Sequence, residues 1–278
     1  MKRLFFGAGY LGQRLTQAIE GAVLSRVDIT DARAVEAELR AHRPDAVINT
    51  AGKTGRPNVD WCESHPIETG RSNVTGPLVL AEQCAQAGVY LLHLGSGCIF
   101  YGDSPTPGGW REDDFANPTS LYSRTKYAAD LVLSRLPGVG IARLRMPIDD
   151  HPDSRNLITK LSRYTQVVDV ANSVTVVSDL IGVVAGLTER KLEGVYHATN
   201  PGEMRHRDLL ALYRELVDPA HRYELISEEA LVGRGLAVKA RSNCTLASGQ
   251  LAAAGLSMRP IEVALRDCVE RYARAVRG

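Results

Sequence analysis

Tyr122 and Lys126 are the residues whose types and spacing most directly suggest chemistry. They stand four positions apart in the segment Tyr-Ser-Arg-Thr-Lys, and in a helix this spacing places both side chains on one face. A lysine ammonium close to a tyrosine favours the tyrosinate and lowers the pKa of the phenol, so the pair can give a proton to a ketone oxygen as hydride reaches the carbon. The lysine can also hold the ribose of a cofactor. The pair therefore predicts a proton-handling site.

Ser96 is the third candidate, 26 residues before Tyr122. It follows the apolar run 90–94, which predicts a buried strand. At the carboxyl end of a parallel strand its hydroxyl would face the crevice where such sheets bind ligands. We interpret Ser96 as the group that orients the carbonyl, although a serine between Gly95 and Gly97 is equally typical of a turn.

Residues 7–12 read Gly-Ala-Gly-Tyr-Leu-Gly and fit the pattern G-x-G-x-x-G. Glycines at these positions allow a tight turn, a close approach of the backbone to a pyrophosphate, and close packing of a helix on a strand. The loop follows an apolar strand and precedes an amphipathic helix, which favours dinucleotide binding over an ordinary turn. The residues predicted to contact the cofactor here and after the next apolar run are Gly7, Gly9, Tyr10, Leu11, Gly12, Ala51 and Gly52.

Arg26 and Asp28 stand where a dinucleotide fold places the residue that contacts the adenosine ribose. Asp28 has the spacing of an acidic residue that would hold the hydroxyls of NAD, whereas Arg26 could pair with a 2′-phosphate. Arg26 is also compatible with an ordinary solvated surface arginine. We expect NADPH as the cofactor and leave NADH open.

Short apolar runs alternate with segments of helical period through the first half of the chain. Parallel strands need crossover connections, usually helices, so this alternation predicts an α/β fold with a Rossmann-type doubly wound parallel sheet. Beyond Arg145 the alternation loosens. We expect residues 1–145 to form the cofactor-binding domain and residues 146–278 to form mainly a smaller C-terminal substrate-binding lobe, with some segments returning to the sheet. Residues 102–117 form a long loop that could act as a lid.

Composition narrows the classes of partner. The formal net charge is +1, without long runs of like charge, so we expect neither a nucleic-acid nor a membrane partner. Five scattered cysteines without a Cys-x-x-Cys pair suggest a reducing compartment, and the histidines show no spacing typical of metal ligands. No apolar run is long enough to span a bilayer. We expect a cytoplasmic protein without a metal, and leave a homodimer open.

Seven segments together resemble one family. They are AGKTGRPNVDWCESH (51–65), GSGCIF (95–100), LYSRTK (121–126), RMPI (145–148), RNLITKLSRY (155–164), NPG (200–202) and ARSN (240–243). The family is the plant nucleotide-rhamnose synthase, a UDP-4-keto-6-deoxyglucose 3,5-epimerase/4-reductase, and more distantly the bacterial dTDP-4-dehydrorhamnose reductases. The resemblance implies an extended short-chain dehydrogenase/reductase that uses NAD(P)H and has Ser96, Tyr122 and Lys126 as its reductase residues.

The same resemblance places Cys98 and Lys160 at the positions of an epimerase acid/base pair. A ketone at C4 of a sugar acidifies the protons at C3 and C5, and a thiol or a partly desolvated lysine can exchange such protons. Without the resemblance, Cys98 is more typical of a small buried side chain and Lys160 of a solvated helix lysine. Arg145, Asn156 and Arg241 could hold the diphosphate of the substrate, or could be structural.

Three hypotheses follow. The first is a bifunctional 3,5-epimerase/4-reductase that forms a nucleotide-linked 6-deoxy-L-sugar such as L-rhamnose. The second is a 4-reductase of the dTDP-4-dehydrorhamnose type without epimerase activity. The third is a non-catalytic NADP-binding regulatory subunit, against which the intact set of Ser96, Tyr122 and Lys126 argues.

Overall fold

The computed structural model describes residues 1–56, 58–239 and 241–278, and this chain divides into two compact units. Unit 1 comprises Met1–Ile99, Phe115–Arg143 and Val184–Tyr196, and unit 2 comprises Phe100–Asp114, Leu144–Val183 and His197–Gly278. The chain therefore crosses between the units repeatedly. Residues 100–114 group with the later part of the chain, and residues 184–196 group with the earlier part.

A six-stranded sheet organises unit 1, in the order β2-β1-β3-β4-β5-β9. Its strands are β1 (Arg3–Phe6), β2 (Ala22–Ser25), β3 (Ala46–Asn49), β4 (Tyr90–Ser96), β5 (Val139–Leu144) and β9 (Gly194–His197). β1 pairs in parallel with both β2 and β3, and β3 with β4. The strand order reverses between β1 and β3, which is where doubly wound sheets bind ligands beyond the carboxyl ends of their strands. The predicted Rossmann-type fold is confirmed.

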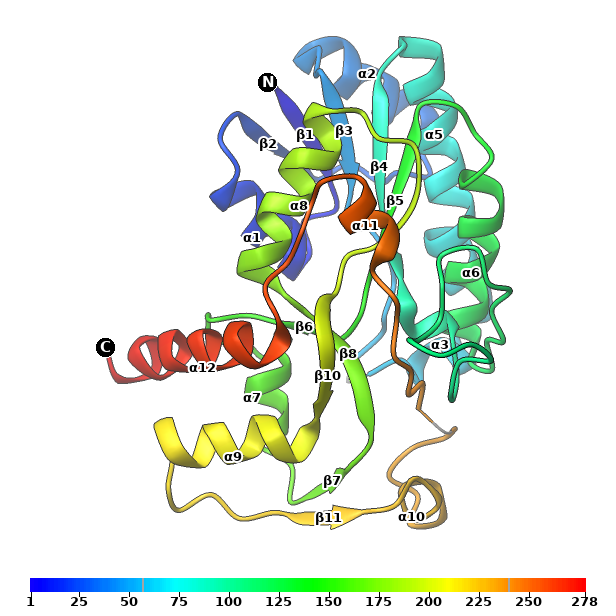
Figure 1. Ribbon diagram of the computed structural model, residues 1–278. Helices are drawn as coiled ribbons and strands as arrows, with labels where there is room; N and C mark the ends of the chain where they lie inside the picture. Colours follow the sequence, from blue (N-terminus) through cyan, green and yellow to red (C-terminus); the bar gives the residue numbers. More distant parts are fainter. Residues whose placement is uncertain (57, 240) are drawn as a thin grey trace. The chain divides into compact units, whose positions relative to one another are not determined.

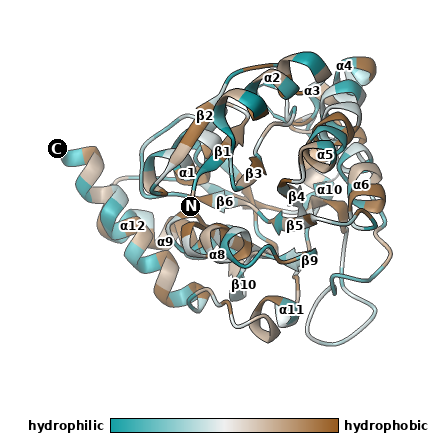
Figure 2. Cartoon of the chain, turned by 90° about the horizontal axis from the view of Figure 1, so that it is seen from above, coloured by the Kyte–Doolittle hydropathy of each residue, from teal (hydrophilic) through white to brown (hydrophobic). Residues whose placement is uncertain are grey.

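The helices of unit 1 cover this sheet. They are α1 (Tyr10–Ala18), α2 (Ala32–His42), α3 (Trp61–Ser64), α4 (Pro66–Gly70), a π-helical turn (Arg71–Thr75), α5 (Gly76–Ala87), a 3-10 turn (Gly97–Ile99) and α6 (Leu121–Leu133). α5 packs against α2 and α6 (Figure 2). Between these helices and the strands lies a core that includes Leu4, Val47, Leu80, Leu91 and Leu133, all fully buried.

Side-chain caps fix where the helices begin. The Asp31 carboxylate accepts hydrogen bonds from the backbone N–H groups of Arg33 and Ala34 at the start of α2. The Ser120 hydroxyl accepts a hydrogen bond from the Ser123 N–H at the start of α6. Such caps satisfy donors that the first helical turn leaves without a partner. The cap at Ser120 thus sets the position of the first turn of α6, which carries Tyr122.

The described residues of unit 2 form a three-stranded sheet and a two-stranded sheet, together with several helices (Figure 1). The elements are β6 (Pro147–Ile148), α7 (Leu157–Leu161), β7 (Gln166–Val168), β8 (Ala171–Val176), β10 (Asn200–Arg205), α9 (His206–Leu216), β11 (Glu224–Ile226), α10 (Glu228–Gly233), α11 (Gly249–Ala253) and α12 (Ile261–Arg277). β8 lies between β10 and β6, and β11 pairs with β7. α12 and α9 pack on this part of the chain around Leu209, Ile261 and Leu265. The helix α8 (Val177–Glu189) begins in unit 2 and ends in unit 1.

The long loop predicted at residues 102–117 contains an anchored segment. The Trp110 side chain is buried and stacks on Phe100, with ring centroids 4.8 Å apart. Its backbone N–H donates to the Thr245 carbonyl, and its carbonyl accepts from the Ala247 N–H. The first part of the proposed lid is therefore tied to the C-terminal region within unit 2.

No helix among the described residues is both long and apolar enough to cross a membrane.

Candidate active site

The glycine loop connects β1 to α1 and has the backbone that its sequence predicts. Gly7 has φ 107°, and an added Cβ there would lie 2.3 Å from the Ala51 nitrogen. A Cβ on Gly12 would lie 1.9 Å from the Gly7 carbonyl oxygen. By contrast, a Cβ on Gly9 would meet none of the described atoms within 4 Å, and Gly9 is the residue that precedes the first turn of α1. The open space at a helix N-terminus fits the pyrophosphate of a dinucleotide.

Arg26 and Asp28 both lie beyond the carboxyl end of β2, but their side chains differ in availability. One Asp28 carboxylate oxygen accepts hydrogen bonds from the Thr30 N–H and the Thr30 hydroxyl, each at 2.9 Å. These bonds hold the pKa of Asp28 below its usual value. Arg26 is exposed and forms no ion pair with the described part of the chain. The structure thus leaves the guanidinium available to an anion, whereas half of the carboxylate is already used in the turn.

Ser96 and Tyr122 meet in unit 1. Ser96 is the last residue of β4 and is buried, and Tyr122 is the second residue of α6. Burial raises the pKa of Tyr122, the nearby Cys98 thiol raises it further, and a hydrogen bond with Ser96 opposes them. The groups that shift it do not include Lys126, so the expected lowering of the phenol pKa by Lys126 stays a prediction. A raised pKa keeps the phenol protonated, which is the form that can donate a proton.

Lys126 lies about one turn after Tyr122 on α6, and its side chain is buried. Its Nζ lies 3.0 Å from Nε2 of His93 and 3.0 Å from the Leu94 carbonyl oxygen. Burial lowers the pKa of Lys126, and the Asp130 carboxylate opposes this shift. The lysine is therefore held against β4 in an environment that disfavours its charged form.

Three polar residues that the sequence analysis did not single out organise this site. Asn49 ends β3, and its side chain contacts Nδ1 of His93 at 2.9 Å. Asn73, in the π-helical turn, accepts from the Lys53 N–H and donates to the Lys53 carbonyl and the Thr125 hydroxyl. The available signal was polarity: His93 interrupts an apolar strand and Asn49 ends one, and buried polar side chains require partners.

An ion pair lies beneath these groups. The Arg143 guanidinium contacts the Asp130 carboxylate at 2.8 Å, with both side chains buried. Burial raises the pKa of Asp130, while Arg143 and Lys126 oppose the shift. Asp130 thus lies one turn from Lys126 on α6, and its charge is compensated mainly by Arg143 of β5.

The expected epimerase pair is divided between the units. Cys98 is half-buried in the 3-10 turn after β4, where its N–H donates to the Ser96 hydroxyl at 3.2 Å. Lys160 is half-buried on α7 of unit 2. Burial lowers the pKa of Lys160, with Asp153 acting in the opposite direction. Cys98 thus belongs beside Ser96 and Tyr122, and Lys160 has the partly desolvated character that proton exchange requires.

The three expected diphosphate ligands all belong to unit 2. The Asn156 amide is fully buried and caps α7; it accepts from the Ile158 N–H and donates to the carbonyls of Asp149 and His151. These hydrogen bonds give the Asn156 side chain a structural role at the start of α7. Arg145 is buried and donates to Asn172 and to the carbonyl of Ser242, the residue that follows Arg241 in the chain. Arg241 is half-buried.

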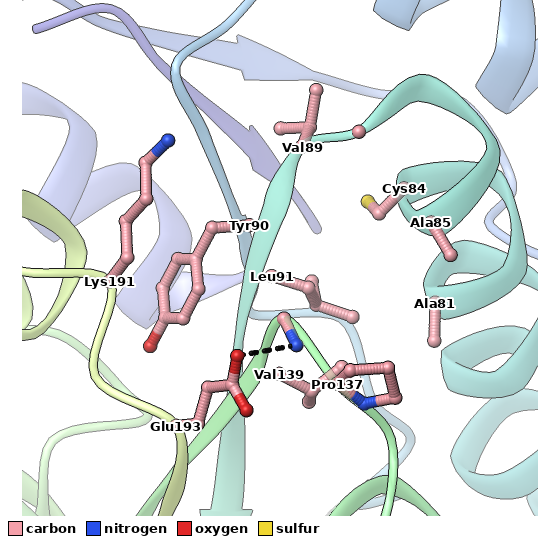
Figure 3. Close-up of a pocket in the computed structure, with 12 residues that line it drawn as sticks. Ala81, Cys84, Ala85, Val89, Tyr90, Leu91, Pro137, Val139, Lys191 and Glu193 are labelled. Atoms are coloured by element: carbon pink, nitrogen blue, oxygen red, sulfur yellow. Dashed lines mark hydrogen bonds between the residues drawn. The ribbon is translucent and has the colours of Figure 1, made fainter.

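Two other features contain none of the predicted site residues. A cavity of about 340 Å³ is lined by residues around Cys84, Tyr90 and Glu193 (Figure 3). It lies at the amino end of β4, about 20 Å along the strand from Ser96. In unit 2, ligand atoms of Asp149, Asp150 and His151 lie within 4.8 Å of one another, but Asp150 already contacts His151, and we assign the group no metal.

Residues 1–274 match the family described as the RmlD substrate binding domain. The chain belongs to this family. A relative in Arabidopsis thaliana, named a bifunctional dTDP-4-dehydrorhamnose 3,5-epimerase/dTDP-4-dehydrorhamnose reductase, is 41% identical over 212 residues, which cover 73% of this chain and 70% of the relative. A second Arabidopsis thaliana relative is a trifunctional UDP-rhamnose enzyme that is 38% identical to this chain. The matched region spans 38% of the length of that enzyme.

Two solved structures resemble the chain over almost its whole length. The L780 UDP-rhamnose synthase of Acanthamoeba polyphaga mimivirus has a TM-score of 0.90 at 30% identity and covers 98% of this chain and 99% of its own. A dTDP-4-dehydrorhamnose reductase from Bacillus anthracis, solved with NADP, has a TM-score of 0.80 at 21% identity and covers 98% of each chain. At this identity the second likeness shows the fold.

Proposed function

We propose that the protein is an NADPH-dependent reductase of a nucleotide-linked 4-keto-6-deoxy sugar and that it also epimerises this sugar at C3 and C5. The observation that carries the reductase is the meeting of Ser96 and Tyr122 at the carboxyl end of β4, with Lys126 on the same helix. The names of the RmlD relatives, which include both reductases and 3,5-epimerase/4-reductases, support this substrate class.

The residues of unit 1 fit a dinucleotide cofactor. The open position at Gly9 and the first turn of α1 would hold the pyrophosphate, and Arg26 would hold a 2′-phosphate. NADP in the Bacillus anthracis relative supports NADPH as the form used. When bound, NADPH supplies the hydride that reduces the ketone carbon.

The chain itself supplies the groups that act on the ketone oxygen. The Ser96 hydroxyl orients this oxygen, and the Tyr122 phenol donates a proton to it. Because burial raises the pKa of Tyr122, the donor remains protonated at neutral pH. Both hydroxyl groups would also stabilise the negative charge that develops on the oxygen when an adjacent C–H is deprotonated.

Epimerisation needs separate proton exchange at carbon. We assign that exchange to the Cys98 thiol, beside Ser96, and to the Lys160 amine, whose pKa is lowered by burial. The nucleotide-sugar is the partner that we propose, with Arg145 and Arg241 as candidate contacts for its diphosphate. A cytoplasmic location and a homodimer stay predictions.

Incubation with UDP- and dTDP-4-keto-6-deoxyglucose separately, with NADPH in deuterated water, tests both activities. We expect NADPH oxidation and, by NMR, solvent deuterium at C3 and C5 of the product with protium at C4. Reduction without deuterium at C3 and C5 would leave a plain 4-reductase. If neither substrate is reduced, even when it is supplied already epimerised, while NADPH binds, the reductase proposal is wrong.

A further inference from the structure

The first turn of α6, which carries Tyr122, is held by two side chains of unit 1. The Ser120 hydroxyl accepts from the Ser123 N–H at 3.2 Å, as an ordinary cap from the preceding residue. The Glu63 carboxylate accepts from the Leu121 N–H at 2.7 Å, although Glu63 lies 58 residues earlier in the chain, on α3. The first four N–H groups of a helix have no partner within it. Side chains therefore bind two of these groups, one from the adjacent residue and one from another helix.

The hydrogen bond from Leu121 to Glu63 fixes the backbone next to the proposed acid. Leu121 is the first residue of α6 and directly precedes Tyr122, so a displacement of its N–H also turns the Tyr122 side chain. A hydrogen bond to a carboxylate is stronger than one to a neutral acceptor, and a negative charge is favoured at a helix N-terminus. Glu63 thus restrains α6 immediately before the residue whose phenol meets Ser96.

α3, which lies beside α6 (Figure 1), is itself anchored to the segment that follows β3. The Trp61 ring stacks on His65, with ring centroids 3.8 Å apart and an interplanar angle of 8°. Gly55, in the preceding loop, has φ 71°, and an added Cβ there would lie 2.4 Å from the Trp61 Cβ. Asn73 accepts from the Lys53 N–H at 2.7 Å and donates to the Lys53 carbonyl at 3.0 Å. The loop and α3 together form a firm base for a side chain that holds another helix.

We propose that Glu63 is a positioning residue that holds the first turn of α6 in register with the end of β3. The segment that leads to Glu63 begins with Ala51 and Gly52, the expected cofactor contacts after β3. One segment would thus contact the cofactor at its start and hold the proton donor Tyr122 at its end. Glu63 acts through the Leu121 N–H and not on the reacting atoms. The hydrogen bond is a property of unit 1 alone, and its kinetic consequence rests on the proposed reductase function.

A positioning contact differs measurably from one that only stabilises the fold. A stabilising contact lowers the melting temperature when it is removed but leaves the rate per folded molecule unchanged. A positioning contact lowers kcat in protein that is fully folded, because small displacements of a catalytic group are costly. Each variant of Glu63 is therefore compared at a temperature where it is folded, with its melting temperature measured separately.

Amide hydrogen exchange, measured by NMR on the full chain without cofactor, tests the contact itself. We expect Glu63→Ala to speed exchange of the Leu121 N–H by about tenfold or more, the factor typical of losing a hydrogen bond to a charged group. Glu63→Gln keeps an acceptor oxygen at the same reach and should change this exchange much less. The Ser123 N–H, which Ser120 holds, is the internal reference. Unchanged exchange at Leu121 in Glu63→Ala would overturn the proposal.

Steady-state reduction of the keto-sugar tests the positioning role. In Glu63→Ala we expect kcat per folded molecule to fall by about 10- to 100-fold, as a displacement of about 1 Å can cost, while the Kd for NADPH stays close to the wild-type value. Glu63→Gln should restore most of kcat, whereas Glu63→Asp, which is one methylene shorter, should not. Glu82→Ala, which removes an exposed acid of α5, is the control and should leave kcat unchanged. A wild-type kcat in Glu63→Ala, or a Gln variant as slow as the Ala variant, contradicts the positioning role.

A double-mutant cycle separates the hydrogen bond from other effects of the carboxylate. Leu121→Pro removes the donor and leaves Glu63 intact, and proline is well tolerated at the first position of a helix. Ser120, with φ −81° and ψ 154°, has the extended backbone that a following proline favours. Measured against Leu121→Ala, which keeps the N–H, Leu121→Pro should slow reduction as Glu63→Ala does, and combining it with Glu63→Ala should add little. Fully additive losses would show that the two residues act independently and would overturn the proposal.

Failure of the proposed function has a different signature. A wild-type protein that binds NADPH but reduces neither keto-sugar, even when the sugar is supplied already epimerised, would contradict the reductase. The exchange rates at Leu121 in Glu63→Ala and Glu63→Gln would then decide by themselves whether Glu63 holds the first turn of α6.

Discussion

At the scale of single residues, the reductase chemistry depends on Tyr122 having a proton to give. Burial raises its pKa and the hydrogen bond with Ser96 only partly opposes this. The balance suits reduction, because the group acts as an acid when the ketone oxygen gains charge. Residues that change the protonation of Tyr122 should therefore matter more than residues that merely pack against it.

Tyr122→Phe removes the proton donor and keeps the ring. We expect kcat for ketone reduction to fall by about 10²- to 10⁴-fold, the usual contribution of general acid catalysis, while NADPH binding measured by fluorescence stays close to the wild-type value. Near-normal turnover would show that another group is the acid. Lys126→Ala should impair both cofactor binding and turnover, because the lysine can contact the cofactor ribose.

Arg26 tests the choice of cofactor. NADPH should bind more tightly than NADH, and Arg26→Ala should narrow this difference by about 1 to 3 kcal/mol, the range for a hydrogen bond to a charged group. Calorimetric titration with both cofactors measures the change. Arg33→Ala, which removes a guanidinium at the start of the neighbouring helix α2, serves as the control and should affect both cofactors little. Equal affinities of the wild type for NADPH and NADH would contradict the assignment.

At the scale of elements, the β1–α1 connection separates packing from binding. Gly12 lies where the helix crosses the preceding turn, and an added Cβ would lie 1.9 Å from the Gly7 carbonyl oxygen. Gly9 has extended backbone, with φ −73°, and open space at its Cα. The same motif thus contains a glycine that the fold requires and a glycine whose open space we propose for the cofactor.

The two glycines form a matched pair of variants. Gly9→Ala should leave the melting temperature of the cofactor-free protein unchanged but weaken NADPH binding, because a methyl group would occupy the space proposed for the pyrophosphate. Gly12→Ala should lower the melting temperature, because overpacking of this kind typically costs about 1 to 3 kcal/mol. Thermal unfolding with and without NADPH distinguishes them. Tight NADPH binding by Gly9→Ala would place the pyrophosphate elsewhere.

At the scale of the whole molecule, the two proposed activities draw on different parts of the chain. Ser96, Tyr122 and Lys126 all belong to unit 1, whereas the proposed epimerase pair takes Cys98 from unit 1 and Lys160 from unit 2. Reduction needs hydride and one proton at oxygen. Epimerisation needs proton removal at carbon before reduction, so the two activities should be separable by mutation.

Cys98→Ser keeps the size of the side chain but replaces the thiol with a much weaker acid. We expect it to slow deuterium incorporation into the 4-keto sugar by a large factor, and we expect the same of Lys160→Ala. Given substrate that is already epimerised, both variants should still oxidise NADPH. If both incorporate deuterium at the wild-type rate, the epimerase proposal is wrong and the plain 4-reductase remains.

The sequence by itself determined the local features, because they depend on neighbours along the chain. The glycine pattern predicted the β1–α1 turn, the apolar alternation predicted the Rossmann-type sheet, and the spacing of four placed Tyr122 and Lys126 on one face of α6. Helical period and strand alternation are local properties, and so they survive in a one-dimensional pattern.

Only the tertiary structure decided the electrostatics of the site and the composition of the units. The pKa of Tyr122 depends on burial and on Cys98. The Lys126 side chain contacts His93, which contacts Asn49, and these two residues lie 33 and 77 positions earlier in the chain. Residues 100–114 belong to unit 2, where Trp110 forms a β-bridge with Leu246. Desolvation and long-range hydrogen bonds arise when distant segments pack together, and no local pattern in the sequence records which segments will meet.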